Sequence, residues 1–149
     1  MSDPEYNKRV VQEAFGAMST HFADLTQGDA SQVLRHFRDD AIWVNRGTSD
    51  PAASKVGLEA IRKMICGFGD VVDPPFDWII HSVTAEGDHV VLEADGVCMT
   101  KAGRPYQNKY CFVVRLIDGR IAHINEYMSN DAVAAAFAQP VGADADRAD

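Results

Sequence analysis

The sequence contains few cysteines, and those present form no recognisable pattern. Cys66, Cys98 and Cys111 are an odd number, stand among apolar neighbours and include no C-x-x-C spacing. Disulfide frameworks and zinc sites normally need paired or closely spaced cysteines. The sequence therefore argues against both, and it predicts buried thiols in a reducing, cytoplasmic environment.

Long apolar runs and excess positive charge are also missing. No stretch approaches the ~20 apolar residues that span a bilayer, and the opening "MSDPEYNKRVV" lacks the basic-then-apolar order of a secretory signal. The chain has 14 Lys and Arg against 22 Asp and Glu, a net charge of −8. Such a field repels nucleic-acid phosphate and anionic membranes. We expect neither as a partner.

Signatures of the common cofactor and nucleophile sites are missing as well. No H-x-H or H-x-x-x-H spacing offers converging metal ligands, and "GFGD" follows a predicted helix rather than a strand, unlike a phosphate-binding loop. No serine stands in a G-x-S-x-G context. We therefore expect no metal and no bound cofactor, and the sequence does not favour nucleophilic catalysis.

What is present predicts one α+β domain. Apolar residues at spacings of three and four predict helices over 6–25, 30–37 and 58–68, with a short strand over 41–45 between the last two. Short turns then separate four alternating segments, which predict an antiparallel meander with strands over 76–86, 89–100, 106–117 and 120–129. A short helix follows over 130–139. We expect the helices to cover one face of a curved sheet. The sequence predicts a single domain over 1–138 and a mobile, Ala- and Asp-rich tail over 139–149.

Carboxylates stand among apolar residues in two of these strands. Side chains two positions apart share a face of a strand, so Glu93 and Asp95 lie on one side of theirs, and Glu126 lies with Ile124 and Met128. A buried carboxylate is costly unless its pKa rises or a donor pairs with it. Both outcomes suit a general acid or base. Alternation alone leaves open whether these acids face a pocket or solvent.

The strand "VLEADG", the hairpin "YQNKYCFVVRLIDGRIAHINEYMSN" and the helices before them resemble the nuclear-transport-factor-2-like superfamily in its SnoaL-like branch. The resemblance extends from about Val10 to Phe137. This branch is similar to limonene-epoxide hydrolases, ketosteroid isomerases and polyketide cyclases. It implies a curved antiparallel sheet that N-terminal helices wrap into a cone-shaped α+β barrel.

The resemblance also implies roles for individual residues. Glu126 stands where these enzymes commonly hold a catalytic carboxylate at the base of the cone, and Trp43 and Asn45 resemble the aromatic and amide groups that hold a water in the epoxide hydrolases. Asp95 matches a carboxylate of those hydrolases, but Glu93 stands where they have an arginine that links two carboxylates. That departure argues against epoxide hydrolysis.

Alternation and resemblance together predict one catalytic face. Its carboxylates, Glu93, Asp95 and Glu126, would share a proton, because like charges raise one another's pKa. Asn108 and Tyr110 would bind a substrate oxygen on the same face. The other expected substrate-binding residues are His21, Phe22, Met64, Phe68 and Met128. His123 falls on the opposite side of its strand from Glu126, where we expect a subunit contact.

The sequence thus predicts a cofactor-independent lyase or isomerase that uses carboxylate acid/base catalysis on an apolar, aromatic or polycyclic small molecule. Dehydration, retro-aldol cleavage, isomerisation and cyclisation stay open. The alternatives are water addition to an epoxide and a non-catalytic binding or assembly module. We also expect a homodimer or other homo-oligomer, because one sheet face would expose much apolar surface. That face is predicted to carry Cys111, Val113, Ile117, Ile121 and Tyr127.

Overall fold

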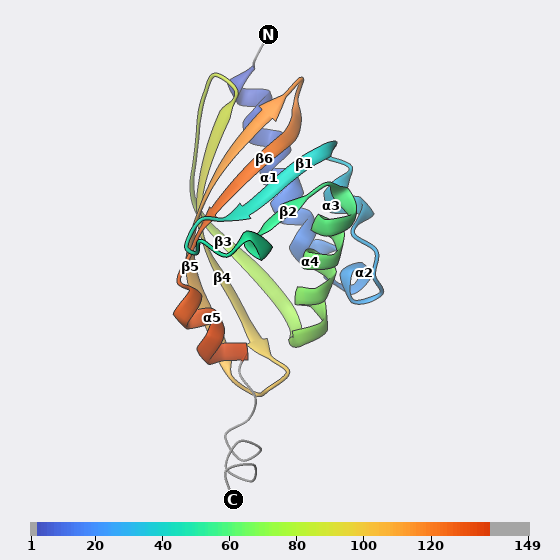
Figure 1. The fold of residues 1–149 in the computed structure, drawn as a ribbon, viewed down its shortest axis with the longest axis vertical. Helices are drawn as coiled ribbons and strands as arrows, with labels where there is room; N and C mark the ends of the chain where they lie inside the picture. The colour runs from blue at the N-terminus through green and yellow to red at the C-terminus, as the bar shows by residue number, and fades with distance from the viewer. Residues whose placement is uncertain (1–2, 138–149) are drawn as a thin grey trace, which may run out of the picture.

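A six-stranded curved sheet is the largest element of the fold (Figure 1). A computed structural model describes residues 3–137 of the chain. The spatial order of the strands is β2-β1-β6-β5-β4-β3. Their bounds are β1 Phe37–Asn45, β2 Ser54–Val56, β3 Val72–Glu86, β4 His89–Thr100, β5 Pro105–Ile117 and β6 Arg120–Tyr127. The α+β class and the four-stranded antiparallel meander β3 to β6 are confirmed.

Two expectations about the sheet are corrected. The sheet is mixed rather than antiparallel, because β1 runs parallel to β6, and it stays open instead of closing into a barrel. The order of the strands explains both corrections. β1 pairs with the last strand of the meander rather than with the strand that follows it along the chain, and β2 and β3 form two separate edges.

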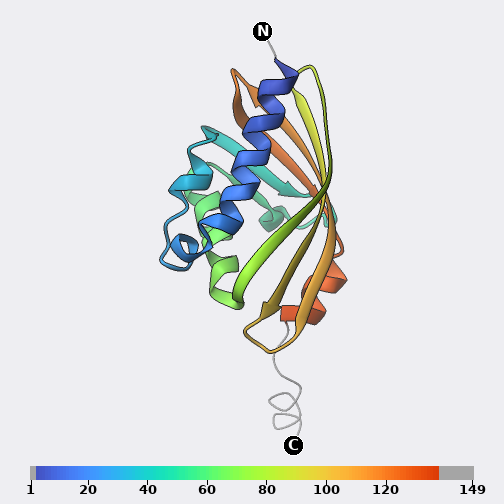
Figure 2. The same ribbon diagram turned by 180° about the vertical axis from the view of Figure 1, so that it is seen from behind.

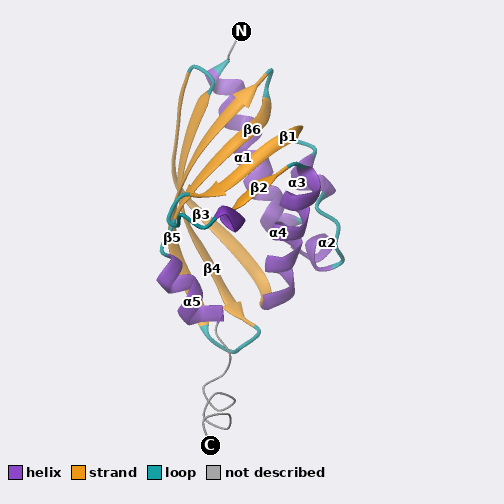
Figure 3. Cartoon of the chain, viewed as in Figure 1, coloured by secondary structure: helices purple, strands orange, loops and turns teal. Residues whose placement is uncertain are grey.

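Helices α1 to α4 gather on the concave side of the sheet, and α5 lies apart from them beside the ends of β4 and β5 (Figures 2 and 3). Their bounds are α1 Pro4–Thr20, α2 Phe22–Thr26, α3 Ser31–Leu34, α4 Leu58–Val71 and α5 Asn130–Phe137, with a 3-10 turn, η1, at Pro51–Ala53. The predicted single helix over 6–25 is broken at His21, whose φ of −110° and ψ of 28° are not helical. The break lets α2 turn toward α4. No helix within residues 3–137 is long and apolar enough to cross a membrane.

Two segments differ from the sequence expectation for physical reasons. The second helix ends early, at Leu34, and β1 begins at Phe37 because Phe37 pairs with Ile121 of β6. β3 begins at Val72 and runs through Pro74 and Pro75. Proline cannot donate to a strand ladder, but β3 is an edge strand, and its pairing with β4 is interrupted at this point.

The inner face of the sheet and the helices enclose an aromatic core. Phe15 of α1 contacts the rings of Trp43, Trp78 and Phe112. Gly96 lies against neighbouring rings, since a Cβ there would lie 3.0 Å from Tyr110 and 3.2 Å from Trp78. The small residue leaves room for the rings that form the floor of the cavity described below.

The outer face of the sheet is not covered by α1 to α4, which lie on the other side (Figure 2), and α5 directs Val133 and Phe137 into the cavity on the inner side. Four of the five residues expected there are partly or fully exposed: Cys111, Val113, Ile117 and Tyr127. The fifth was placed wrongly, because Ile121 is fully buried and pairs with Leu116. The homodimer itself stays a prediction. All three cysteines are free, while the cytoplasmic location stays a prediction and the tail 139–149 lies outside the described residues.

Candidate active site

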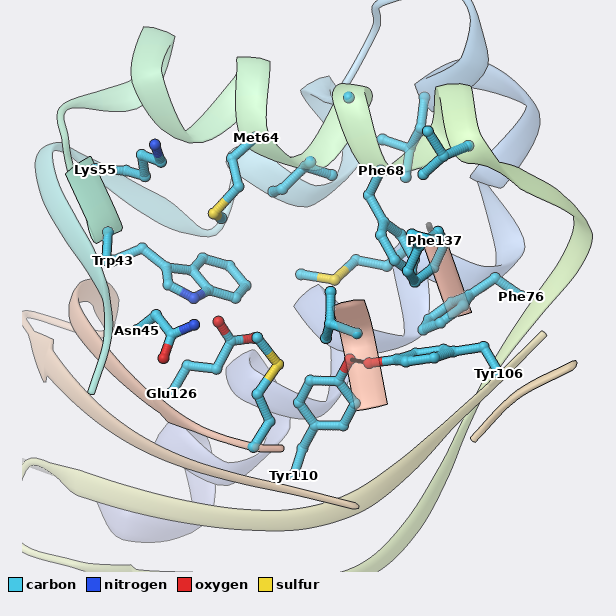
Figure 4. A pocket seen from close by; sticks show the side chains of 18 of the residues that line it. Trp43, Asn45, Lys55, Met64, Phe68, Phe76, Tyr106, Tyr110, Glu126 and Phe137 are labelled. Carbon is cyan, nitrogen blue, oxygen red and sulfur yellow. Dashed lines mark hydrogen bonds between the residues drawn. The ribbon is translucent and has the colours of Figure 1, made fainter. Parts of the chain in front are cut away.

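A cavity of about 480 Å³ lies between the concave face of the sheet and helices α2, α4 and α5 (Figure 4). Its walls are mostly apolar, and only two of the side chains that line it are charged, Lys55 and Glu126. The other lining residues include Met18, Phe22, Trp43, Asn45, Met64, Phe68, Phe76, Trp78, Tyr106, Tyr110, Met128, Val133 and Phe137. A largely apolar concave site with a few polar groups is the usual form of a small-molecule site.

A bulge in β6 turns Glu126 into this cavity. The Asp118-Gly119 turn, with φ of 52° and 75°, closes a tight hairpin in which Ile117 pairs with Arg120. If this pairing continued along β6 without a shift, Glu126 would lie opposite Cys111 on the outer face of the sheet. The register shifts by one residue after Leu116, so Glu126 pairs with Phe112 and faces inward. A one-residue shift exchanges the two faces of a strand.

Burial raises the pKa of Glu126 to about 7. The carboxyl group stands among apolar walls, which disfavour its charged form. The indole N–H of Trp43, which faces the carboxyl group in Figure 4, acts in the opposite direction. It falls short of hydrogen-bond geometry, since the buried Nε1 of Trp43 has no partner within residues 3–137. Glu126 is therefore poised to exchange a proton near neutral pH.

Asn45 is held beside Glu126 by the parallel pairing of β1 with β6. Its Nδ2 donates to Oδ1 of Asn130 at 2.8 Å, and its Oδ1 accepts from the backbone N–H of Gly47 at 2.9 Å. These contacts fix the orientation of the amide. In Figure 4 its nitrogen lies on the side of Glu126, so the second N–H of the amide is available to a ligand.

Two tyrosines form a hydrogen-bonded pair in the same cavity. The hydroxyl groups of Tyr106 and Tyr110 are hydrogen-bonded to each other, and Nδ2 of Asn108 donates to the Tyr106 hydroxyl at 2.9 Å. One of the two hydroxyl protons is used within the pair, so the other remains for a ligand. Burial raises the pKa of both tyrosines. They therefore stay protonated and can donate.

The structure places Glu93 and Asp95 on the other side of the sheet. Tyr110 pairs with Ala94, and Asp95 pairs with Lys109, so the predicted common face of Asp95 and Tyr110 is wrong. Glu93 is exposed and accepts from Ser82. The error arose because alternation shows which residues within one strand share a face, but not which residues of the neighbouring strand lie on that same face. The pairing register between the two strands decides this.

Asp95 is instead tied into the outer face, with only 6% of its surface exposed. His81 Nε2 lies 3.1 Å from one carboxylate oxygen, and Gln107 Nε2 donates to the other at 3.2 Å. Lys109 Nζ lies 3.6 Å from that second oxygen. The hydrogen bond from Gln107 and the nearby positive groups lower the pKa of Asp95. These contacts join three strands.

Most of the predicted site residues meet in the cavity. Those that line it are Glu126, Trp43, Asn45, Tyr110, Phe22, Met64, Phe68 and Met128. Asn108 lies behind the wall as a support for Tyr106. His21 is outside the lining and faces Asp24 at 3.4 Å. The sequence prediction missed Tyr106, although Tyr106 shares a face of its strand with Tyr110 by simple alternation. It also missed Lys55, because the sequence around its short strand is typical of a loop.

Comparison with known proteins agrees with the fold. Residues 18–124 match the family model of the SnoaL-like domain. An NTF2-like protein of unknown function from Burkholderia pseudomallei superposes with a TM-score of 0.74 and 18% identity, over 93% of this chain and 99% of that one. An LEH-like epoxide hydrolase from M. tuberculosis gives 0.70 and 20%, over 91% and 92%.

A third solved structure, a protein with a ketosteroid isomerase-like fold from Catenulispora acidiphila, gives a TM-score of 0.70 and 19% identity, over 88% of this chain and 93% of that one. Identities this low indicate a shared fold. No curated protein sequence matches this chain.

Replacing Glu126 with Gln should stabilise the protein at high pH. The raised pKa means that the native state holds a proton between about pH 4.5 and 7 that the unfolded chain releases, so native stability falls as pH rises through this window. Glu126→Gln removes that loss. We expect the free energy of unfolding to rise by up to about 3 kcal/mol at pH 8 and to change little at pH 4. Urea unfolding at both values measures it; a variant less stable than wild type at pH 8 contradicts it.

Replacing Asp95 with Asn should weaken the fold at neutral pH. Its lowered pKa means that the charged form stabilises the native state above the ordinary pKa of 3.8, and that this contribution is lost as pH falls. Thermal melts at pH 7 and pH 3 should show a lower Tm for Asp95→Asn at pH 7 and a smaller difference at pH 3. Asp77→Asn, an exposed acid on the same sheet face, is the matched control. Equal effects of the two variants would disprove the role given to these contacts.

Proposed function

The chain belongs to the SnoaL-like family, and we propose that its cavity is an active site for proton transfer at carbon. The substrate is an apolar, aromatic or polycyclic molecule with a carbonyl group, and the reaction is an isomerisation or an elimination. Glu126 is the general base, and no cofactor takes part in this step. The cavity of about 480 Å³ with its aromatic walls suits a substrate of this class.

The proposal rests mainly on the raised pKa of Glu126. A general base works best when its pKa lies near the working pH, and burial brings the pKa of this carboxyl group to about 7. The same burial costs stability whenever Glu126 is charged. A module that only bound its ligand would gain from an uncharged side chain here, so the carboxyl group supports catalysis over passive binding.

The chemistry needs one carboxyl group and one donor. Glu126 removes a proton from the carbon next to the substrate carbonyl, and the electron pair of the C–H bond moves to the carbonyl oxygen as an enolate. The free hydroxyl proton of the Tyr106 and Tyr110 pair donates to that oxygen. Glu126 then returns the proton to another carbon of the conjugated enolate, which gives an isomer. Alternatively, the enolate re-forms the carbonyl group and expels a leaving group from the next carbon, which departs with the proton from Glu126 and gives an elimination.

The lining of the cavity supports this reaction over water addition to an epoxide. Hydrolysis in the pattern implied by the sequence resemblance uses two carboxylates linked by an arginine. Among the residues that line the cavity, Glu126 is the one carboxylic acid, and Asp95 lies on the other side of the sheet. A single carboxyl group that both takes and returns a proton needs no such partner.

Proton exchange at carbon tests the proposal directly. A panel of aromatic and polycyclic ketones in D2O should lose the proton next to the carbonyl group, followed by NMR, with a rate that rises with pH and levels off above about pH 7 because the base must be ionised. Glu126→Gln should slow this exchange by about 100-fold or more. Glu86→Gln, an exposed acid on β3, is the control. Exchange that Glu126→Gln leaves unchanged would rule out the proposed base.

The tyrosine pair has its own test. Tyr110→Phe removes one hydroxyl group and the hydrogen bond that orients the other, so exchange should slow by about 100-fold while the pH dependence set by Glu126 is retained. Phe112→Leu is the control, because it alters the same strand and the ring stacked on Tyr110 but removes no hydrogen-bond donor. If Tyr110→Phe and Phe112→Leu slow exchange equally, the tyrosines support packing rather than the enolate oxygen.

A further inference from the structure

Lys55 is the one cationic side chain among the residues that line the cavity. It lies on β2 and pairs with Trp43 of β1, which directs both side chains to the inner face of the sheet. The neighbouring Ala52 of η1 is exposed, so the lysine stands at the rim of the cavity. In Figure 4 it lies on the other side of the Trp43 indole from Glu126.

The ammonium group of Lys55 has no acidic partner. Its Nζ donates to the backbone carbonyl of Ala52 at 2.7 Å, and none of the ion pairs formed within residues 3–137 includes it. An ammonium group carries three donors. The contact with Ala52 holds the group in place and leaves two donors and the whole charge for another partner.

Glu126 does not supply that partner. The Trp43 indole lies between the two side chains in Figure 4, and burial sets the pKa of Glu126 with Trp43 as the only opposing group. A nearby ammonium group would lower that pKa. The ammonium group of Lys55 at the rim and the carboxyl group of Glu126 inside are therefore two separate polar groups in one apolar cavity.

We infer that Lys55 binds a carboxylate of the substrate at the rim of the cavity and so selects apolar carboxylic acids over neutral analogues. This inference rests on the proposed function and names its substrate class. A substrate anchored in this way places its apolar rings between Phe68, Phe76 and Trp78 and presents its interior to Glu126. A charge-assisted hydrogen bond in a partly desolvated site is among the stronger polar contacts.

Calorimetric titration with a matched pair of probes tests the inference. A biphenyl carboxylate and the corresponding biphenyl carboxamide have the same rings and differ in charge. Near pH 6 Glu126 is largely protonated and does not repel the anion. We expect the wild-type protein to bind the carboxylate about tenfold more tightly than the carboxamide. Lys55→Met should abolish this preference and leave the carboxamide affinity unchanged, and Lys55→Arg should keep it.

Lys63→Met is the control, since Lys63 is exposed on α4 and its loss changes the net charge equally. Equal binding of both probes by the wild type, no binding of the carboxylate at millimolar concentration, or equal losses in the two methionine variants would overturn the inference. The proton-exchange experiment is separate. Loss of exchange in Glu126→Gln together with no charge preference would leave the proposed base intact and remove only the role of Lys55.

Discussion

The site depends on one irregularity in the sheet, the register shift in β6. Ile121 and Ile124 both face inward although they are three residues apart, because the extra residue between them changes the alternation. With a regular hairpin, Glu126 would stand on the outer face beside Cys111. The bulge turns it inward, and the parallel pairing with β1 then sets it opposite Asn45. Bulges commonly re-aim side chains in this way next to active sites.

The inward carboxyl group lowers stability, and the rest of the fold offsets that cost. Its burial disfavours the ionised form, while the surrounding aromatic core of Phe15, Trp43, Trp78 and Phe112 is closely packed. Sites that carry reactive groups are often less stable than they could be. Here Glu126 stands on a central strand, β6, between β1 and β5 rather than on a loop, so its position is fixed even though its charge is unfavourable.

The sequence was sufficient for the α+β class and the meander, because these follow from periodicity and turn chemistry, whereas Glu126, Trp43 and Asn45 of the cavity were predicted from the family resemblance. The Asp118-Gly119 turn and the apolar stripe of α1 are local signals. Which residues of two neighbouring strands face the same side of the sheet is not determined by local sequence signals. Alternation predicts correctly which neighbours share a face with Asp95 in β4 and with Tyr110 in β5. The two residues nevertheless face opposite sides of the sheet, because the loop between β4 and β5 sets a register that cannot be read from its sequence. The burial of Ile121 was missed for a different reason, because the bulge in β6 breaks the alternation within that strand.

The correction of Asp95 also changes the chemistry that the cavity can perform. Three acids on one face would have shared a proton and supplied an acid and a base together. With Glu126 alone, the proton that would leave the substrate in the proposed reaction has one acceptor, so the same carboxyl group must give it back or the substrate must lose a group elsewhere. Charge on the substrate oxygen then has to be met by neutral donors, and the buried tyrosines, whose pKa values are raised, remain protonated for that purpose. The one cation, Lys55, stands apart from this centre, which suits binding a distant group better than stabilising the enolate.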